Sequence, residues 1–257
     1  MKPLAHTVER TLTVSAPRDL VFAYLSDTAR FATWWGPGSS IEGRLAGAVR
    51  IRYPNAVIAS GEVVDIEAPR RILFTYGYED PAKGLSPGAS RVTITLEEGG
   101  TAGTVVQLRH ELPDATTRDA HIAGWRFQLS LFANVVSREA HAGAGAIIDR
   151  FFTAWNTADP ERRRAALAEA VTADVAFRDP YAAVTGRDEL AAHIAAVHAF
   201  MPGLSMIPAG EARQCQGTAL CEWAARGPDG APRGAGTNVF TLAPDGRIAA
   251  CVGFWNG

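Results

Sequence analysis

The chain has 257 residues, of which 47% are hydrophobic and 20% are charged, values typical of a globular protein that can bury a core. Twenty-five Lys and Arg against 27 Asp and Glu give a net charge of −2. This balance gives no electrostatic reason to expect nucleic acid or an anionic membrane as a partner, and the length allows one domain or two.

The cysteines are three in number, Cys215, Cys221 and Cys251, and none of them forms a C-x-x-C pair. An odd number without that spacing argues against a disulfide framework or a zinc knuckle. The first ten residues show no apolar core followed by a small-residue cleavage site, so no secretory signal is evident. We therefore expect a protein of the reducing cytoplasm.

One stretch, residues 190–210, runs for 21 residues without Asp, Glu, Lys or Arg, a length that matches a membrane span. The same stretch contains His193, His198, Pro202 and Pro208, and proline interrupts helices. Its composition therefore predicts a helix followed by a strand.

The first half of the chain predicts a strand, a helix and then a sheet. Residues 8–14 have strand character, and Pro17 followed by apolar residues at helical spacing predicts one amphipathic helix. A turn is predicted at residues 34–37. Five short runs with strand character follow, at residues 48–53, 56–66, 71–78, 91–96 and 104–111, separated by Gly, Pro and Asn. They predict an antiparallel meander.

A long helix is predicted next, because Ile122, Trp125, Leu129, Phe132 and Val136 recur at spacings of 3, 4, 3 and 4. These spacings place the five side chains on one continuous apolar stripe. Such a stripe needs a sheet to cover it.

A break follows at residues 141–146, where small residues without periodicity form either a flexible linker or a weak helix start. We place a domain boundary here, with a first domain over residues 1–140 and a second over residues 141–257. The second domain is predicted to contain helices near residues 147–155, 165–171 and 190–197, and strands near residues 175–178, 204–209, 215–225, 237–242 and 247–255.

Four segments of the first domain together match the sequence pattern of a known family. They are residues 16–22, Trp34-Trp35-Gly36-Pro37, residues 69–74, and Gly124-Trp125 preceded by His121. With them the domain resembles the START-like (SRPBCC) superfamily, in particular its branch of heat-shock-protein ATPase activator homologues. The resemblance implies a helix-grip fold, in which the long last helix lies across a curved antiparallel sheet and leaves a cavity. Functions in that branch are diverse, so the resemblance implies architecture more than activity.

The second domain is similar to the SnoaL-like branch of the nuclear transport factor 2-like superfamily, which includes ketosteroid isomerase and polyketide cyclases. The residues that carry this likeness are 149–159, 173–180, 186–190 and 245–248. The resemblance implies a cone-shaped α+β barrel with an internal pocket, commonly dimerising through its sheet. The chain is therefore expected to be α+β throughout, with a possible homodimer through the C-terminal domain.

Asp179 falls where the steroid-isomerase relatives place a general base. A carboxylate at the mouth of an apolar cone can have a raised pKa and can shuttle a proton beside a carbonyl group. An Asp before Pro also caps a strand and shapes a turn through its side chain, without any catalysis. The sequence leaves both interpretations open.

The implied oxyanion site departs from the isomerase pattern at two positions. Phe151 stands where a tyrosine is expected and has no hydroxyl, whereas Asn238 stands where the family has a protonated Asp and still offers a donor. Because the loss of one oxyanion donor costs ~10²-fold to 10³-fold in rate, a proficient steroid-type isomerase is not expected. Proton transfer or aldol-type cyclisation with weaker demands stays open, with Asp179 and Asn238 as the candidate catalytic residues.

Aromatic residues are the candidates for lining both cavities. In the second domain they are Phe151, Trp155, Trp223, Phe240 and Trp255. In the first domain they are Trp34, Trp35, Phe74, Tyr76 and Trp125, joined by His121, whose imidazole can orient a ligand or titrate near neutral pH. Each of these residues also fits ordinary core packing, and both interpretations stay open.

The histidines of the second domain give no metal signal. His193 and His198 are five residues apart, about 140° around a helix, so they do not share the face that metal-binding histidines at i and i+4 would. We interpret both as partly exposed polar residues. No nucleophile-elbow, Walker or dinucleotide-binding motif occurs, and we expect no metal and no cofactor.

These features predict a protein that binds a small apolar or aromatic molecule in internal cavities, with cyclase-type or isomerase-type proton transfer open to the C-terminal domain. The alternative is a non-catalytic stress or chaperone-accessory protein that acts through the N-terminal domain. The balanced charge favours ligand binding over that alternative.

Overall fold

The computed structural model describes residues 4–256, and these residues form two compact units. The first unit ends at Ser137 and the second begins at Arg138. Both units combine a sheet with helices, so the α+β class predicted from the sequence is confirmed.

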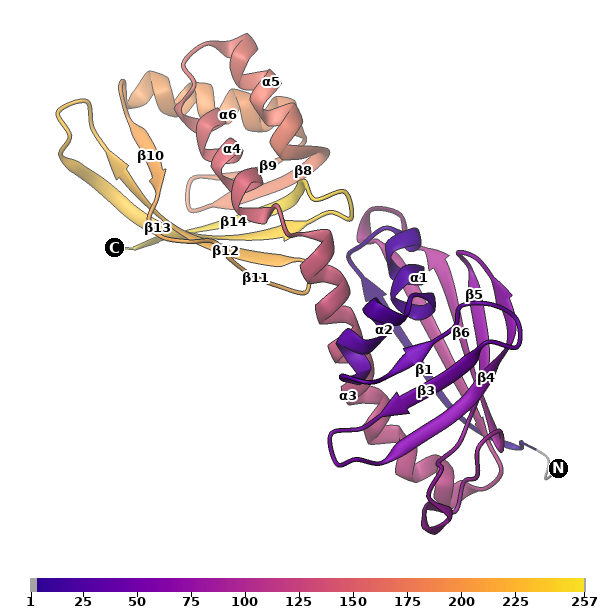
Figure 1. Ribbon diagram of the computed structural model, residues 1–257. Helices are drawn as coiled ribbons and strands as arrows, with labels where there is room; N and C mark the ends of the chain where they lie inside the picture. The colour runs from indigo at the N-terminus through magenta and orange to yellow at the C-terminus, as the bar shows by residue number, and fades with distance from the viewer. Residues whose placement is uncertain (1–3, 257) are drawn as a thin grey trace. The chain divides into compact units, whose positions relative to one another are not determined.

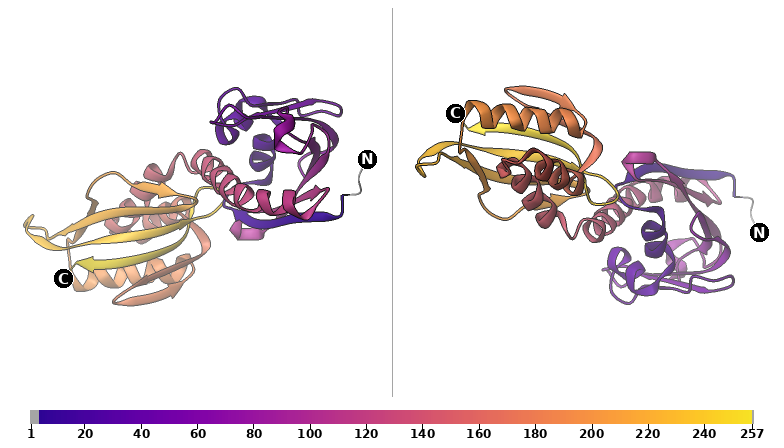
Figure 2. Two further views of the ribbon diagram at one scale, coloured as in Figure 1. Left: turned by 90° about the horizontal axis from the view of Figure 1, so that it is seen from below. Right: turned by 90° about the horizontal axis from the view of Figure 1, so that it is seen from above.

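Within the described residues, the N-terminal unit is built on a seven-stranded antiparallel sheet in the order β1-β7-β6-β5-β4-β3-β2. Its strands are β1 (His6–Val14), β2 (Ser40–Ile41), β3 (Ala48–Arg52), β4 (Ile58–Glu67), β5 (Arg71–Tyr76), β6 (Ser90–Glu98) and β7 (Thr104–Leu112). The predicted meander is therefore confirmed. The sheet curves around the helices of the unit (Figures 1 and 2).

Helix α3 (Ala115–Ala140) lies across this sheet and realises the helix-grip arrangement (Figure 1). Of the five residues predicted to form the apolar stripe, Trp125, Leu129, Phe132 and Val136 are buried, whereas Ile122 is only half-buried. The stripe packs toward the sheet because an exposed row of large apolar side chains would lose the free energy of burial.

Two helices precede β2, namely α1 (Arg18–Ser26) and α2 (Thr28–Trp35). The sequence predicted one helix and then a turn at residues 34–37. That turn prediction is wrong for Trp34 and Trp35, which form the last residues of α2 and are both buried. The turn begins only after them.

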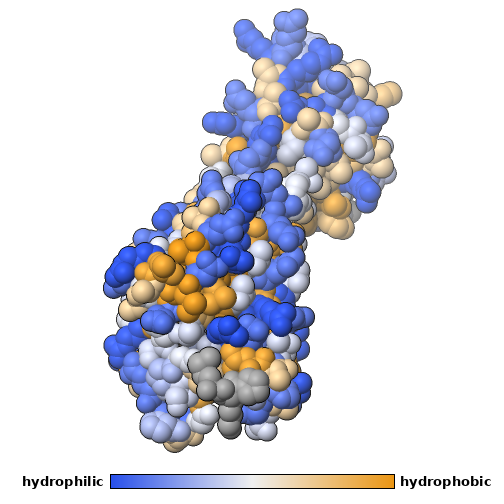
Figure 3. All heavy atoms as spheres, turned by 90° about the vertical axis from the view of Figure 1, so that its right-hand side faces the viewer, coloured by the Kyte–Doolittle hydropathy of each residue, from blue (hydrophilic) through white to orange (hydrophobic). Residues whose placement is uncertain are grey.

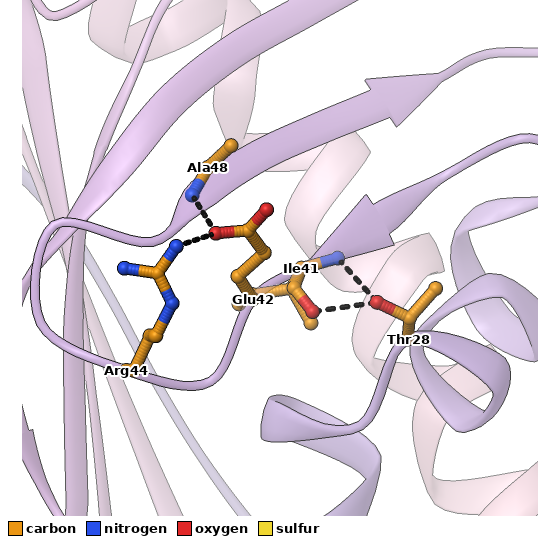
Figure 4. Close-up of polar contacts among 5 residues, drawn as sticks. All are labelled: Thr28, Ile41, Glu42, Arg44 and Ala48. Carbon is orange, nitrogen blue, oxygen red and sulfur yellow. Dashed lines mark hydrogen bonds and ion pairs between the residues drawn. The ribbon is translucent and has the colours of Figure 1, made fainter.

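A local cap and a contact with the sheet explain the second helix. The Asp27 side chain accepts a hydrogen bond from the Arg30 N–H at 2.9 Å, which starts a new helix directly after α1. Thr28 Oγ1 then donates to the Ile41 carbonyl at 2.6 Å and accepts from the Ile41 N–H at 3.2 Å (Figure 4). The two bonds fix α2 to β2 and thereby hold its tryptophans over the sheet.

The C-terminal unit, within the described residues, contains a second sheet of seven strands, in the order β10-β12-β13-β14-β8-β9 with β11 beside β12. The strands are β8 (Val171–Asp179), β9 (Ala182–Thr185), β10 (Ser205–Pro208), β11 (Arg213–Cys215), β12 (Thr218–Arg226), β13 (Pro232–Leu242) and β14 (Ile248–Asn256). Only β14 and β8 pair in parallel among these described strands. The short strands β9 and β11 are absent from the sequence prediction.

The helices of this unit are α4 (Ala144–Asn156), α5 (Pro160–Ala170) and α6 (Arg187–Phe200), which pack on one another and on the sheet (Figure 1). Residues 190–210 form most of α6 and then β10, so the predicted helix followed by a strand is confirmed. Across residues 4–256, no helix combines the length and the apolar character needed to cross a membrane.

The surface of the N-terminal unit carries a few large apolar side chains. On the face that Figure 3 shows, hydrophobic residues gather in patches among hydrophilic ones. Leu45, Val64, Phe127 and Leu131 are the exposed large hydrophobic residues of this unit, among those described. Phe127 and Leu131 are one helical turn apart on α3, and both also line a cavity.

Candidate functional site

A cavity of about 530 Å³ lies in the C-terminal unit, a volume within the range of small-molecule sites. Most of its wall is aromatic or aliphatic. The apolar and aromatic lining residues are Trp155, Phe177, Tyr181, Ala196, Val197, Phe200, Met201, Leu204, Met206, Trp223 and Trp255. Asp179, His193, Arg233 and Asn238 add the polar groups, and Gly253 completes the lining.

Three of the five aromatic residues predicted for this cavity line it. Trp155, Trp223 and Trp255 face it, and the rings of Trp223 and Trp255 lie 4.9 Å apart at 79°. Phe151 and Phe240 do not line the cavity. Both are fully buried and pack edge to face on each other at 5.3 Å, so they belong to the core between α4 and β13.

Asp179, at the end of β8, both shapes a turn and faces the cavity. Its Oδ1 accepts hydrogen bonds from the N–H groups of Tyr181 and Ala182 at 2.8 and 2.7 Å. This is the turn role that the Asp-Pro sequence suggests. Its Oδ2 lies 4.0 Å from Nε2 of His193, and the Asp179 side chain is 7% exposed. One carboxylate oxygen is therefore structural, and the other is directed to a second titratable group.

His193, on α6, is a cavity residue, so the interpretation of this histidine as merely a partly exposed polar residue is incomplete. Its side chain is 14% exposed, and its ring packs against those of Trp155 and Phe177 at 5.7 and 5.6 Å. Among the described residues, Nε2 has no hydrogen-bond partner. A signal was available in the sequence, because His193 follows the buried Leu190 by three residues and shares its face of α6.

Asn238 lies on β13, and Gly253 of β14 stands between it and Asp179. Its Oδ1 accepts a hydrogen bond from the Trp223 indole N–H at 3.0 Å. Gly253 pairs with Asn238 in register, and a side chain there would begin 3.1 Å from Asn238 Oδ1 and 3.4 Å from Asp179 Cβ. The two candidate catalytic residues are thus brought together, and the amide NH₂ of Asn238 is the group that can donate to a ligand oxygen.

A second cavity, of about 480 Å³, lies in the N-terminal unit beneath α3. Five of the six predicted residues line it, namely Trp34, Trp35, Tyr76, His121 and Trp125. The other lining residues are Thr33, Gly36, Tyr53, Pro54, Tyr78, Ala120, Gly124, Phe127, Gln128 and Leu131. Phe74 does not line the cavity. It lies on the same face of β5 as Tyr76, two residues before it, and is buried in the core.

The polar groups of this cavity are tyrosine hydroxyls and an imidazole. His121 Nδ1 lies 2.7 Å from the Thr117 carbonyl and therefore carries the proton, so Nε2 accepts from the Tyr78 hydroxyl at 3.2 Å. The hydroxyls of Tyr53 and Tyr76 share a hydrogen bond of 2.7 Å. Burial raises the pKa of both Tyr53 and Tyr76 above the ordinary value.

His110, on β7, supports this wall from behind. Its Nδ1 accepts from the Trp125 indole N–H at 2.9 Å, so the ring proton is on Nε2 and is donated to Ser90 Oγ at 2.8 Å. Ser90 in turn donates to the Tyr76 carbonyl at 2.8 Å. Burial, together with the nearby His121, lowers the pKa of His110 to about 3, so this histidine is neutral at pH 7.

Sequence reasoning missed Tyr53, Tyr78 and His110. A signal existed for His110, because strict alternation along β7 places it on the same buried face as Val106 and Leu108. A signal existed for Tyr53 and Tyr78 as well, because they end the runs predicted as strands at residues 48–53 and 71–78, where alternation places them on the faces of the buried Ile51 and Tyr76.

Neither cavity has the composition of a metal site. Within residues 4–256, no group of three or more His, Cys, Asp or Glu side chains is arranged to hold a metal ion. The three cysteines are free thiols, Cys215 exposed and Cys221 and Cys251 buried. Burial, and to a lesser extent the charge of Asp179, raises the pKa of the Cys251 thiol.

Comparison with known families agrees with the fold of both units. Residues 15–137 match the family described as activator of Hsp90 ATPase homolog 1-like protein, and residues 148–251 match the SnoaL-like domain. The chain is therefore a two-domain α+β protein, in which an AHSA1 domain of the SRPBCC superfamily precedes a SnoaL-like domain. No curated protein matches the chain.

Solved structures resemble one half of the chain each. A protein of Agrobacterium tumefaciens, named provisionally as an isomerase of the SnoaL-like family, is 31% identical over 46% of this chain and 99% of its own, with a TM-score of 0.43. The AHSA1 protein of Silicibacter pomeroyi is 25% identical over 50% of this chain and 95% of its own, with a TM-score of 0.41.

Proposed function

We propose that the protein binds small apolar or aromatic molecules in its internal cavities, and that the C-terminal cavity moves a proton on a bound carbonyl compound. The observation that carries this proposal is the pair formed by Asp179 and His193 on the wall of a mostly apolar cavity. Two groups that can exchange a proton are placed beside space for an apolar molecule.

In this proposal Asp179 and Asn238 have separate roles. Because two backbone N–H groups hold Asp179 Oδ1, the carboxylate is fixed in orientation and Oδ2 is the oxygen that can take a proton from the carbon next to a carbonyl. The C–H electron pair moves toward the carbonyl oxygen, and the Asn238 NH₂ can donate to the resulting enolate. Return of the proton to another carbon isomerises the substrate, whereas attack of the enolate carbon on a second carbonyl carbon gives cyclisation, and the proton held by Asp179 then passes to the new alkoxide.

His193 supports the proton transfer at the same carboxylate oxygen, Oδ2, to which it can give or from which it can take the proton. Its Nε2 lies 4.0 Å from Asp179 Oδ2, and such contacts often shorten when a ligand is bound. Only one side-chain amide stands ready for the enolate, and Phe151 supplies no hydroxyl. The proposed activity is therefore slow compared with that of a site with two oxyanion donors.

Deuterium exchange tests the role of Asp179 directly. The full-length protein is incubated in D₂O with a panel of aromatic ketones, and deuterium at the α-carbon is followed by NMR. Asp179→Asn keeps an oxygen for the turn but removes the base, so we expect exchange to fall by at least about a hundredfold. The matched control is Asp174→Asn, on the same strand but exposed to solvent.

Exchange that continues unchanged in Asp179→Asn would remove this residue from the mechanism. Ligand binding is measured separately, by native mass spectrometry of the purified protein and by calorimetry with the same ketones. Binding without exchange leaves the binding proposal standing and rejects the catalytic one. Absence of a bound small molecule together with capture of a chaperone would favour the alternative, an accessory role of the N-terminal domain.

We place this function in the reducing cytoplasm. The three cysteines are free thiols, and free thiols persist where glutathione and thioredoxin keep them reduced. We also propose a homodimer through the sheet of the C-terminal unit, whose outer face exposes Val252 and Phe254 on β14.

A further inference from the structure

The N-terminal cavity differs from the C-terminal one in charge. Its lining contains no Asp, Glu, Lys or Arg, whereas the C-terminal cavity contains Asp179 and Arg233. The two histidines nearest to it, His110 and His121, both have a pKa lowered chiefly by burial. The cavity wall is therefore electrically neutral at pH 7.

The same wall is rich in neutral hydrogen-bonding groups. The Tyr78 hydroxyl donates to His121, which leaves lone pairs on the Tyr78 oxygen. In the pair formed by Tyr53 and Tyr76, one hydroxyl donates and the other accepts, so the proton of the accepting hydroxyl is available to Tyr78 or to a ligand. The cavity thus offers acceptor lone pairs, and a ligand that takes the place of Tyr78 as the acceptor also finds a donor.

One tryptophan of this wall has a donor without a partner. Trp35 lines the cavity and is 5% exposed, yet its indole N–H has no hydrogen-bond acceptor among the described residues. The other two tryptophans of the wall are satisfied, Trp34 by the Tyr24 carbonyl and Trp125 by His110. A buried N–H without an acceptor is costly, and because this nitrogen is enclosed, a ligand oxygen reaches it only if the rings around it move.

Aromatic rings surround these groups. The ring of Trp35 lies 5.9 Å from that of Tyr53 at 82° and 5.6 Å from that of Trp125 at 75°. Gly124, on α3, adds no side chain to this wall, and a Cβ built there meets nothing within 4 Å. The missing side chain leaves room beside the rings for a flat molecule.

We propose that the N-terminal cavity is a binding site for an uncharged aromatic molecule that carries a carbonyl or hydroxyl oxygen, with the tyrosine hydroxyls as the groups that recognise this oxygen and Trp35 as a ring that packs on the molecule. The proposal deepens the proposed binding function by naming the ligand class of one cavity, and it does not depend on proton transfer in the other. A carboxylate is excluded because no cation lines the wall to offset the cost of burying its charge.

A pair of probes of similar shape tests the selection against charge. 2-Acetylnaphthalene is neutral, and 2-naphthoate carries a carboxylate on the same ring system. Each is titrated into full-length protein labelled with 5-fluorotryptophan, with the ¹⁹F signals assigned by single Trp→Phe substitutions. The chain has six tryptophans, and Trp35 and Trp125 report on this cavity while Trp155, Trp223 and Trp255 report on the other.

We expect the ketone to shift the Trp35 and Trp125 signals, with binding at least about a hundredfold tighter than that of the naphthoate. Tyr78→Phe, which removes one hydroxyl, should weaken ketone binding about threefold to tenfold. The matched control is Tyr24→Phe, because that hydroxyl donates to the Val135 carbonyl and does not line the cavity.

Gly124→Leu, which adds a side chain at a lining position, should narrow the cavity and weaken the ketone-induced shifts of Trp35 and Trp125. The comparison of the two probes on the unmodified protein needs no variant, so it remains decisive if a variant fails to fold. Equal affinity for both probes at Trp35 and Trp125, or no shift of these signals with the ketone, would overturn the proposal. Shifts confined to Trp155, Trp223 and Trp255 would overturn it while leaving ligand binding by the C-terminal cavity intact.

Discussion

His110 makes the stability of the N-terminal unit dependent on pH. In the folded chain the pKa of this histidine is about 3, because burial in the wall behind Tyr76 disfavours its charged form. In the unfolded chain the pKa of a histidine is about 6.5. Since the folded pKa is depressed, the stabilisation is complete above the unfolded pKa and is lost as the pH falls toward the folded pKa.

The size of the effect follows from this difference. Between pH 6.5 and about 3, the unfolded state binds one proton that the folded state does not, and each pH unit costs about 1.4 kcal/mol. Moving from pH 7.5 to pH 5 should therefore remove about 2 kcal/mol of the free energy of unfolding. That loss is a large share of the stability of an ordinary domain.

The assay compares the natural protein with His110→Asn, which keeps an acceptor for the Trp125 indole but does not titrate. Urea unfolding is followed by circular dichroism at pH 7.5 and pH 5. At pH 7.5 the variant should be about 1–3 kcal/mol less stable, because the hydrogen bond to Ser90 is lost. At pH 5 the difference in the free energy of unfolding between the two proteins should be smaller by about 2 kcal/mol.

Thr104→Ala, which removes a buried hydrogen bond of the same unit but no titratable group, serves as the control and should lower the free energy of unfolding equally at the two pH values. NMR titration of the His110 ring proton gives a direct check, since its signal should stay constant from pH 8 to pH 5. A gap that is equal at the two pH values, or a His110 signal that titrates near pH 6.5, would refute this reasoning.

Two further predictions concern the C-terminal unit. Gly236→Ala should destabilise it by about 1–3 kcal/mol in thermal unfolding, because the added Cβ would begin 2.1 Å from the Phe254 carbonyl oxygen and 2.5 Å from the Trp223 ring. An unchanged melting temperature would contradict this. The control is Gly145→Ala, because an added Cβ there meets open space. Phe254→Glu should convert the proposed dimer to a monomer in sedimentation velocity, since Phe254 is 55% exposed on the outer sheet face. Leu45→Glu is the control there, and a dimer that persists would exclude this face.

The elements of the fold were largely predictable because their signals are local. The apolar stripe of α3, from Trp125 to Val136, follows from spacing alone, and so does the alternation that marks β7. The second N-terminal helix was missed because one cap residue, Asp27, restarts a helix that the apolar pattern had already ended.

Membership of a cavity was predictable only in part. Phe151 and Phe240 are aromatic, as Trp155 and Trp223 are, and recur with a similar periodicity, yet they lie in the closed core while the tryptophans face the cavity. Periodicity gives the face of an element, whereas depth along that face depends on which other element covers it.

What the sequence by itself determined was the α+β class, the division into two different domains, and the place of Asp179 at the end of a strand. The tertiary structure alone decided that Asp179 Oδ2 faces His193, and that Tyr53, Tyr78 and His121 meet in one uncharged wall. The physical reason is the distance along the sequence over which each kind of signal acts. Hydrogen-bonded periodicity acts over a few residues, but the charge and shape of a cavity depend on side chains that only the packed chain brings together.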